Sequence, residues 1–277
     1  MATIAEILGT KYPLIQGSMA RISRHELVIG VSNAGGLGVL TSAGFDKEGL
    51  REEIRKVKAV TDKPFAVNLM LMMKNIPEMV EVIIEEEVPF VMTGAGTPKP
   101  YMPALTEAGI KVIPVIPSVK LAKKMEDLGA VAVAAEGMES GGHVGETTTM
   151  ALVPQVASAV NIPVIAAGGI GDGRGVAAVY TLGAQGIQAG TIFLTADETP
   201  VPDAFKQAEI LHIARADLEE LSLGSLSKAV FEGDVENGSV MAGEISGMVN
   251  SKRSVKDIIE GLFNEAEEVV NNLKITY

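Results

Sequence analysis

The strongest constraint on this fold is an alternation of short apolar runs with longer amphipathic segments along most of the chain. Aliphatic and β-branched side chains fill both faces of each run, as they do in parallel strands that are covered on both sides. Eight such runs occur: Tyr12–Gln16, Gly38–Thr41, Phe65–Met70, Phe90–Thr93, Lys111–Val115, Ala130–Ala135, Pro163–Ala167 and Gly186–Gly190. Because parallel strands need a crossover connection, usually a helix, the alternation predicts a series of βα units.

The segments between the runs have helical periodicity, and several end at Gly or Asn, as helices commonly do. They are Arg24–Ala34, Asp46–Val60, Pro77–Glu87, Tyr101–Ala108, Ser118–Leu128, Met150–Val160 and Gly173–Leu182. Pro64, Pro89 and Pro163 stand at the entry to expected strands, where a missing N–H is least costly. Eight repeats of one βα unit favour a closed (β/α)8 TIM barrel over an open doubly wound sheet, and 277 residues suffice for one.

The repeating pattern stops after Thr191, and a polar, irregular stretch follows. Further helices are expected near Leu223–Glu232, Ser239–Met248 and Val255–Asn272. We therefore expect a barrel over residues 1–194, a short insert over 195–222, and C-terminal helices over 223–277 that pack back on the barrel.

The composition excludes several kinds of site. Without cysteine the chain has no disulfide, thiolate nucleophile, iron–sulfur cluster or Cys-ligated zinc. No group of His, Asp and Glu has the spacing of metal ligands, so we expect no metal. The net charge of −12 argues against binding to nucleic acid or to an anionic membrane. The first residues lack a signal peptide's basic and apolar regions, and no run of about 18 apolar residues occurs, which predicts a cytoplasmic protein.

In such a barrel the chemistry belongs at the C-terminal ends of the strands, which here are rich in Gly, amide and hydroxyl residues. Gly168-Gly169 and Gly190-Thr191 follow the seventh and eighth strands, where barrels commonly bind phosphate. Backbone without side chains lets N–H groups face an anion, and the next helix adds its dipole. The alternative is that these glycines only make tight turns. Because P-loop and dinucleotide spacings are absent, a mononucleotide across the barrel mouth fits better.

One of the three histidines has a suggestive position. His143 lies between Gly142 and Val144 in a glycine-rich loop after the sixth strand, which makes it the candidate for proton transfer or carbonyl polarisation. The alternative is that His143 is a loop residue with no catalytic role. His25 stands at a helix start and is expected to be a surface or capping group, and His212 is expected to be exposed.

Other candidates have competing interpretations. Glu136, at the end of the sixth strand, is expected to bind ribose or ribityl hydroxyls, although a general base or a partner of lysine would fit too. Met70, Met72 and Met73 are interpreted as an adaptable substrate wall or as core. Near residue 240, either Ser239 caps a helix or Met241 lies over a flat cofactor ring.

Several of these segments together form specific motifs that extend over nearly the whole chain. They are residues 136–145 (EGMESGGHVG), 148–150 (TTM), 163–170 (PVIAAGGI), 188–191 (QAGT), 12–17 (YPLIQG), 33–38 (NAGGLG), 62–65 (DKPF), 93–96 (TGAG), 228–230 (KAV), 233–235 (GDV) and 238–243 (GSVMAG). The chain closely resembles the nitronate monooxygenase (2-nitropropane dioxygenase-like) flavoprotein family. Within it, the enoyl-acyl-carrier-protein reductase II branch is the nearest match.

This resemblance implies an FMN-bound TIM barrel in which NADH or NADPH reduces the flavin. Reduced flavin then passes hydride to a trans-2-enoyl thioester on acyl carrier protein, in fatty-acid synthesis. His143 matches the active-site histidine, which would hydrogen-bond the thioester carbonyl or supply the proton. The positions matched to cofactor binding are Gly17, Ser18, Met19, Ala20, Asn68, Thr93, Glu136, Gly141, Gly142, Ala167, Gly168, Gly169, Gln188, Ala189, Gly190, Thr191 and Met241.

The chain also departs from that branch. The reductases usually have a second glycine at Ser18, an aromatic at Arg21, arginine at Ile192 and glutamine at Glu244. They carry a longer segment between about Thr195 and Leu223, which forms a lid that shapes the acyl tunnel. A nitronate monooxygenase that oxidises nitroalkanes with oxygen, and a flavin-binding protein that has lost turnover, therefore stay as alternatives.

The resemblance further implies a homodimer and an acidic carrier protein as partner. A carrier would need a basic patch, and two candidates are Lys120, Lys123 and Lys124, or Arg51, Arg55 and Lys56. Both are more simply interpreted as solvated helix faces.

Overall fold

The computed structural model describes residues 2–142, 144–210, 227–236 and 241–274. Eight parallel strands form one sheet in the order β1-β8-β7-β6-β5-β4-β3-β2. Their bounds are β1 Leu14–Gln16, β2 Gly38–Thr41, β3 Phe65–Met70, β4 Phe90–Gly94, β5 Lys111–Ile116, β6 Val133–Glu136, β7 Val164–Ala167 and β8 Gly186–Ala189. The backbone N–H groups of Gln16 and Leu37 donate to the carbonyls of Leu37 and Leu14 at 2.9 and 2.8 Å, so β1 meets the start of β2. The predicted TIM barrel is confirmed.

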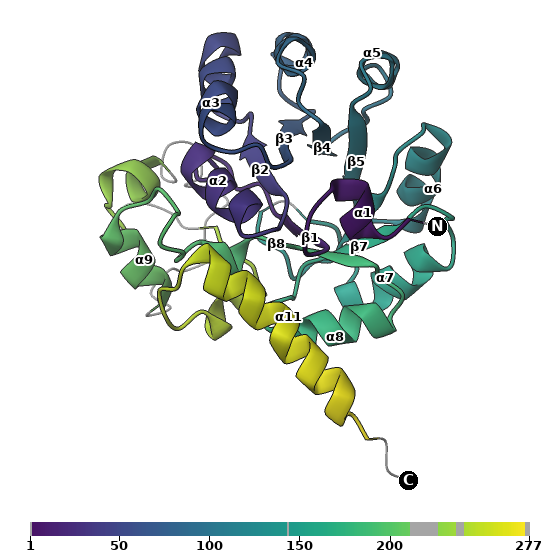
Figure 1. Ribbon diagram of the computed structural model, residues 1–277, viewed down its shortest axis with the longest axis vertical. Coiled ribbons are helices and arrows are strands. Elements are labelled where there is room, and N and C mark those ends of the chain that lie inside the picture. Colours follow the sequence, from purple (N-terminus) through teal and green to yellow (C-terminus); the bar gives the residue numbers. More distant parts are fainter. Residues whose placement is uncertain (1, 143, 211–226, 237–240, 275–277) are drawn as a thin grey trace.

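Helices alternate with the strands and surround them (Figure 1). Their bounds are α1 Ile4–Leu8, α2 His25–Asn33, α3 Lys47–Val60, α4 Ile76–Glu85, α5 Met102–Glu107, α6 Val119–Asp127, α7 Thr149–Ala157 and α8 Gly173–Thr181. The strand-entry prolines stand directly before β3, β4 and β7, as predicted. Pro89 and Pro163 lack an N–H, yet their carbonyls accept hydrogen bonds from Lys111 and Val133 of the neighbouring strands, both at 3.1 Å.

The core has an inner layer and an outer layer. Alternate strand residues such as Ile15, Phe90 and Ile165 fill the barrel, and the other strand faces pack against the helices. Helix α1, which the periodicity does not predict, adds fully buried Ile4 and Leu8 to the inner cluster. A Cβ on Gly186, the first residue of β8, would lie 3.0 Å from Ile4, so α1 closes the N-terminal end of the barrel.

The C-terminal part forms short helices and one long helix. These are η1 Thr191–Phe193, α9 Asp203–Ile210, the π-helical η2 Lys228–Glu232, the 3₁₀-helical η3 Glu244–Met248 and α11 Val255–Asn272. Helix α11 packs along α8, and its last turns extend beyond the barrel (Figure 1). Helix α11 has the predicted bounds. None of the described helices combines the length and the apolar character that crossing a membrane requires.

The helix expected over Ser239–Met248 is wrong for the residues that the structure describes. Met241–Gly243 are not helical, and only the turn Glu244–Met248 is. The N–H of Gly243 donates to Thr191 Oγ1, and the N–H of Glu244 donates to the carbonyl of Glu139, both at 2.9 Å. These two N–H groups therefore bond to distant parts of the barrel and do not extend a helix. Ser239 lies outside the described residues.

Candidate functional site

A cavity of about 470 Å³ opens at the C-terminal ends of the strands. The predicted cofactor positions that line it are Gly17, Ser18, Met19, Ala20, Asn68, Glu136, Gly141, Gly142, Gly168, Gly169, Gln188, Ala189, Gly190, Thr191 and Met241. Thr93 and Ala167 are buried strand residues and do not line it. His143 lies outside the described residues, although its neighbours Gly142 and Val144 both line the cavity. The structure thus brings most of the predicted cofactor positions, from five different strands and the C-terminal segment, around one cavity.

The loop after β1 is held by a buried pair of polar side chains. Gln16 and Ser23 are fully buried; Gln16 Nε2 donates to Ser23 Oγ at 2.9 Å, and Gln16 Oε1 accepts from the N–H of Val39 at 3.0 Å. Ser23 Oγ in turn accepts from the N–H of Met19 at 2.8 Å. These bonds fix the loop on both sides, so its cavity-facing residues are preorganised.

Ser18, between those anchors, has a hydroxyl that lacks a partner. Its Oγ is buried and makes no hydrogen bond, yet the residue lines the cavity. A buried polar atom without a partner costs about 1–3 kcal/mol, and native proteins keep few of them. A ligand with a polar atom at this loop would satisfy Ser18.

Glu136 brings a carboxyl group into the cavity at the end of β6. Burial raises its pKa to about 7, and a hydrogen bond with Ser140 only partly offsets that effect. Near neutral pH the carboxyl is therefore poised between an ionised acceptor and a neutral donor. Either form can bond to ligand hydroxyls, and the ionised form gains most from donors that reduce its cost of burial.

The loops after β7 and β8 present backbone to the cavity. Gly168 and Gly169 have φ of +93° and +73°, a conformation that glycine adopts without strain. A Cβ on Gly168 would lie 2.9 Å from Ser140 Oγ, so a side chain there would meet the β6 loop. Gly190 adds a third position without a side chain, at the start of η1. Together these loops offer unshielded N–H groups to an anion.

Helix α8, which was expected to add its dipole to the phosphate site, is already capped. The Asp172 carboxylate accepts from the N–H groups of Arg174 and Gly175 at 3.0 and 3.2 Å. Glu265, from α11, accepts from the N–H of Gly173 at 2.8 Å. Because carboxylates take these three donors, an anion is left with the two glycine loops and the start of η1.

A second group of residues, absent from the predicted set, supports the β6 loop. Glu139 accepts from the N–H of Thr149 at 2.9 Å, and Thr149 Oγ1 lies 3.0 Å from the carbonyl oxygen of Gly168. A Cβ on Gly137 would lie 2.1 Å from Thr149 Oγ1, so only glycine fits there. These contacts join β6, β7 and α7, and no local spacing in the sequence signals them.

The remaining wall of the cavity is apolar. It includes Met70, Met92, Pro114, Val115, Ile116, Pro117, Leu121 and Met125, from β3, β4, β5, α6 and the loop between β5 and α6. Of the three methionines considered together from the sequence, only Met70 reaches the cavity; Met72 is exposed and Met73 packs against the outer core. The cavity therefore has a polar side formed by β6, β7, β8 and β1, and an apolar side.

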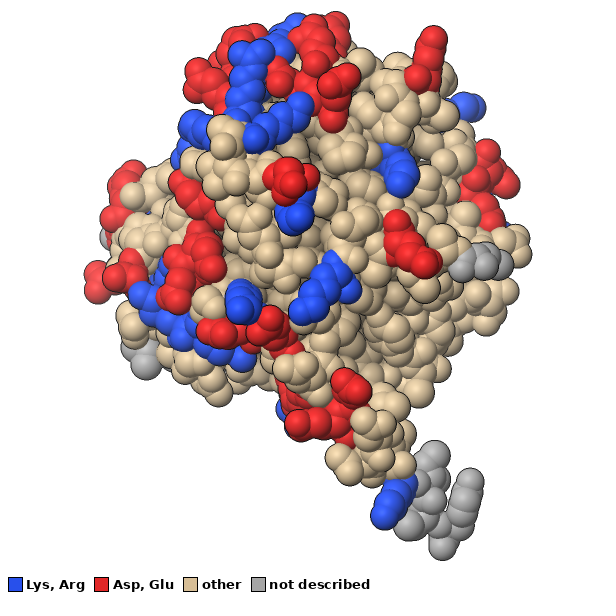
Figure 2. Space-filling model, viewed as in Figure 1, with Lys and Arg blue, Asp and Glu red and all other residues tan. Residues whose placement is uncertain are grey.

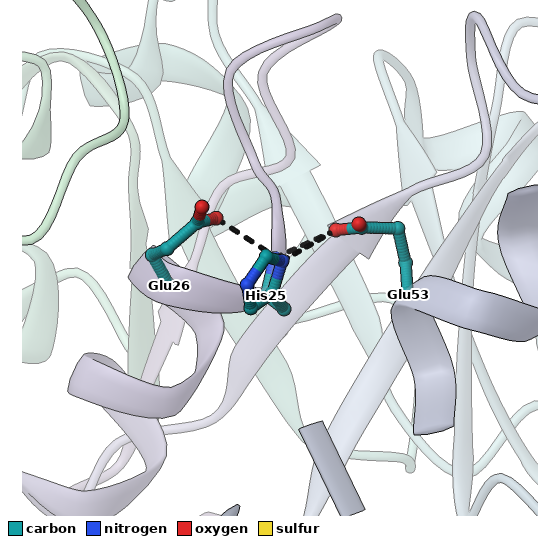
Figure 3. Close-up of side chains that lie close together, drawn as sticks. All are labelled: His25, Glu26 and Glu53. Carbon is teal, nitrogen blue, oxygen red and sulfur yellow. Dashed lines mark hydrogen bonds and ion pairs between the residues drawn. The ribbon is translucent and has the colours of Figure 1, made fainter. Parts of the chain in front are cut away.

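A cluster of potential metal ligands lies elsewhere, between α2 and α3 (Figure 3). The Glu53 carboxylate contacts His25 Nδ1 at 2.9 Å, Lys56 Nζ at 2.8 Å and Arg24 at 3.3 Å. Burial alone would raise its pKa, but the bonds with Lys56 and His25 prevail and lower the pKa to about 2. Protein cations already neutralise Glu53, so the cluster is an ion-pair network that joins α2 to α3. His25 is part of it and is not the simple surface or capping group expected.

Basic and acidic side chains alternate over α3 and α4 (Figure 2). Arg51 pairs with Glu85 at 2.7 Å, and Arg55 pairs with Glu86 at 2.8 Å. Lys56 pairs with Glu53. Arg51, Arg55 and Lys56 therefore already have acidic partners on this protein, as a solvated helix face would.

Comparison with known proteins gives the family. Residues 2–81 and 72–223 match the family model described as nitronate monooxygenase. The (3aS,4S,5R,7aS)-5-hydroxy-7a-methyl-1-oxo-octahydro-1H-indene-4-carboxyl-CoA dehydrogenase of Rhodococcus jostii is 36% identical over 91% of this chain and 71% of its own length. A probable nitronate monooxygenase of Staphylococcus saprophyticus is 38% identical over 74% of this chain and 71% of its own. The structure of FabK from Thermotoga maritima has a TM-score of 0.93 and 41% identity, over 98% of both chains.

The chain belongs to the nitronate monooxygenase family. It is thus a member of a family of FMN-dependent oxidoreductases. The residues at the cavity fit that cofactor: the glycine loops suit its phosphate, Glu136 with Ser140 suits its ribityl hydroxyls, and the unpartnered Ser18 hydroxyl suits a polar edge of its ring.

Proposed function

We propose that this protein is an FMN-dependent enoyl-acyl-carrier-protein reductase, which takes electrons from NADH or NADPH and reduces trans-2-enoyl thioesters in fatty-acid synthesis. The observation that carries the proposal is the match to FabK over 98% of both chains. A relative named for a carboxyl-CoA substrate also supports a thioester as the substrate class. Since the FabK chain and this one cover each other almost fully, the short segment after Thr195 does not separate this chain from that structure.

Each side of the cavity has a role in this reaction. Gly168, Gly169 and Gly190 would hold the phosphate of FMN, and Glu136 would accept from its ribityl hydroxyls. When bound, FMN supplies hydride transfer from NAD(P)H to the β-carbon of the enoyl thioester. The preorganised loop after β1 would orient the ring, and the apolar wall would exclude water from the reacting carbons.

His143, which lies outside the described residues, is assigned a role by the family resemblance. A hydrogen bond from its imidazole to the thioester carbonyl would stabilise negative charge that develops on that oxygen, or its proton would go to the α-carbon. We expect His143→Ala to lower kcat by about 10²–10⁴-fold while the protein keeps its flavin. Unchanged turnover of every enoyl substrate would remove His143 from the mechanism.

The test of the proposal is a spectroscopic one. The purified protein should show the visible absorption of bound flavin, and NADH or NADPH should bleach it under anaerobic conditions. Crotonyl thioester should then restore the oxidised spectrum. Bleaching without reoxidation by any enoyl thioester would contradict the proposal and favour a flavin-binding protein without turnover.

A nitronate monooxygenase is the second candidate, because the Staphylococcus saprophyticus relative has that name at 38% identity. Such an activity would consume oxygen when a nitronate is added, and it would need no NAD(P)H. Oxygen uptake measured with nitronate and with NADH plus crotonyl thioester, on one preparation, separates the two functions.

A further inference from the structure

The apolar side of the cavity extends beyond the barrel mouth. Ile116 ends β5, and Met125 lies on α6; each is only 2% exposed, yet both line the cavity. Both also belong to the core layer between the strands and the helices. The cavity therefore continues from the strand ends into the space between β5 and α6.

We call this extension the α6 arm and define it by Ile116, Pro117, Leu121, Met125 and Val144. None of these five side chains carries a charge. Residue 145 closes the arm beside Pro117, since a Cβ there would lie 2.6 Å from the Pro117 side chain and only glycine fits. A space lined by an apolar strand end and an apolar helix face suits a hydrocarbon chain.

Leu121 and Met125 stand four residues apart on α6, so they share one helix face. Four residues of α-helix span about 6 Å, so these two side chains line the arm over that length. The neighbouring polar side of the cavity, with Glu136, Gly168 and Gly190, has the groups expected to hold the cofactor. The α6 arm thus belongs to the apolar side of the same cavity, apart from the groups expected to hold the cofactor.

We infer that the α6 arm binds the aliphatic chain of a linear acyl thioester, and that Leu121 and Met125 set the chain length that this enzyme prefers. The inference rests on the proposed function, because it names the substrate class of the same site.

The preference can be measured with coenzyme A thioesters of different length. Octenoyl-CoA has four more methylene groups than crotonyl-CoA. If the arm buries those groups fully in the step that governs kcat/KM, the kcat/KM for octenoyl-CoA should exceed that for crotonyl-CoA by on the order of a hundredfold. We expect the flavin-loaded wild type to prefer octenoyl-CoA by at least about tenfold.

The variants Leu121→Trp and Met125→Trp would fill the arm. We expect each to bring the ratio of kcat/KM for octenoyl-CoA over crotonyl-CoA close to one, while the visible spectrum of the bound flavin stays that of wild type. Leu121→Ala, which widens the arm and does not crowd it, should move the preference toward dodecenoyl-CoA. Asp127→Trp, at an exposed position of the same helix, is the matched control and should keep the wild-type ratio.

Each outcome has one meaning. If the tryptophan variants keep the wild-type ratio, or if they lose flavin while Asp127→Trp keeps it, the arm does not bind the acyl chain and the inference is overturned. If Leu121→Ala leaves the preferred length unchanged, Leu121 does not set it. If the flavin-loaded wild type reduces neither thioester, the proposed function itself fails.

Discussion

Replacing Glu136 by Gln tests whether a buried, ionised carboxylate at this position lowers the free energy of unfolding. Burial raises the pKa of this group from 4.5 to about 7. A difference of about 2.5 in pKa corresponds to about 3 kcal/mol at 1.36 kcal/mol for each pKa unit. The unfolded chain loses the proton first as pH rises, so ionisation destabilises the folded protein above about pH 4.5 and reaches its full effect above about pH 7.

The assay is urea unfolding of the flavin-free protein at pH 5 and pH 8. We expect Glu136→Gln to unfold with a free energy about 1 kcal/mol above wild type at pH 5 and about 3 kcal/mol above it at pH 8. Glu52→Gln, which changes an exposed glutamate on α3, should show no such dependence on pH. An equal gain at both pH values would refute the claim that Glu136 is costly because it ionises while buried.

The same carboxyl group should couple flavin binding to pH. If ribityl hydroxyls donate to Glu136, they stabilise its ionised form and lower its pKa in the complex. FMN should then bind more tightly to wild type as pH rises from 5 to 8, relative to Glu136→Gln. The comparison with the variant removes the titration of the FMN phosphate itself, which both proteins share. Identical pH profiles would exclude this hydrogen-bonding role.

Three further predictions concern other parts of the molecule. Ser18→Ala should weaken FMN binding by about fivefold to tenfold and shift the visible spectrum of the flavin. Ser42 also has a buried hydroxyl without a partner, but it lies outside the cavity, so Ser42→Ala should change neither property. Because the pKa of Glu53 is lowered to about 2, the free energy of unfolding of wild type should fall by up to about 3 kcal/mol as pH falls from about 4.5 to about 2. The free energy of unfolding of Glu53→Gln, measured over the same pH range, should show little of this decrease. Gly173→Ala should lower the free energy of unfolding by more than 2 kcal/mol, because its Cβ would lie 2.4 Å from the backbone of Ala266. Gly247 has open space around it, so Gly247→Ala should not lower the free energy of unfolding in this way.

Much of the barrel could be predicted because its signals are local. Runs such as Phe65–Met70 and helices such as Asp46–Val60 have the periodicity of their own element, and Pro64, Pro89 and Pro163 mark the joints. One element that the periodicity missed also had a local signal. Helix α1 is only five residues long, too short for a periodic signal, although its capping box of Thr3 and Glu6 was readable.

Residues around the site were predictable when their position followed from the barrel itself. Gly168 and Gly190 follow strands, and strand ends must converge in a parallel barrel. The supporting pair Glu139 and Thr149 was not predictable, because it depends on how the β6 loop turns back onto α7. The same holds for Asp172, whose side chain caps α8 and withdraws that helix from the expected anion site.

By itself the sequence determined the repeat of eight βα units, and hence which ends of the strands carry the chemistry, since apolar periodicity and strand direction are properties of neighbouring residues. It also determined the family, through motifs that need no folding to be recognised. Only the tertiary structure decided that the Ser18 hydroxyl is buried without a partner, that Glu136 is costly to ionise, and that the cavity extends to Met125 on α6. Burial and hydrogen-bond satisfaction arise between residues far apart in the chain, so no window of sequence contains them.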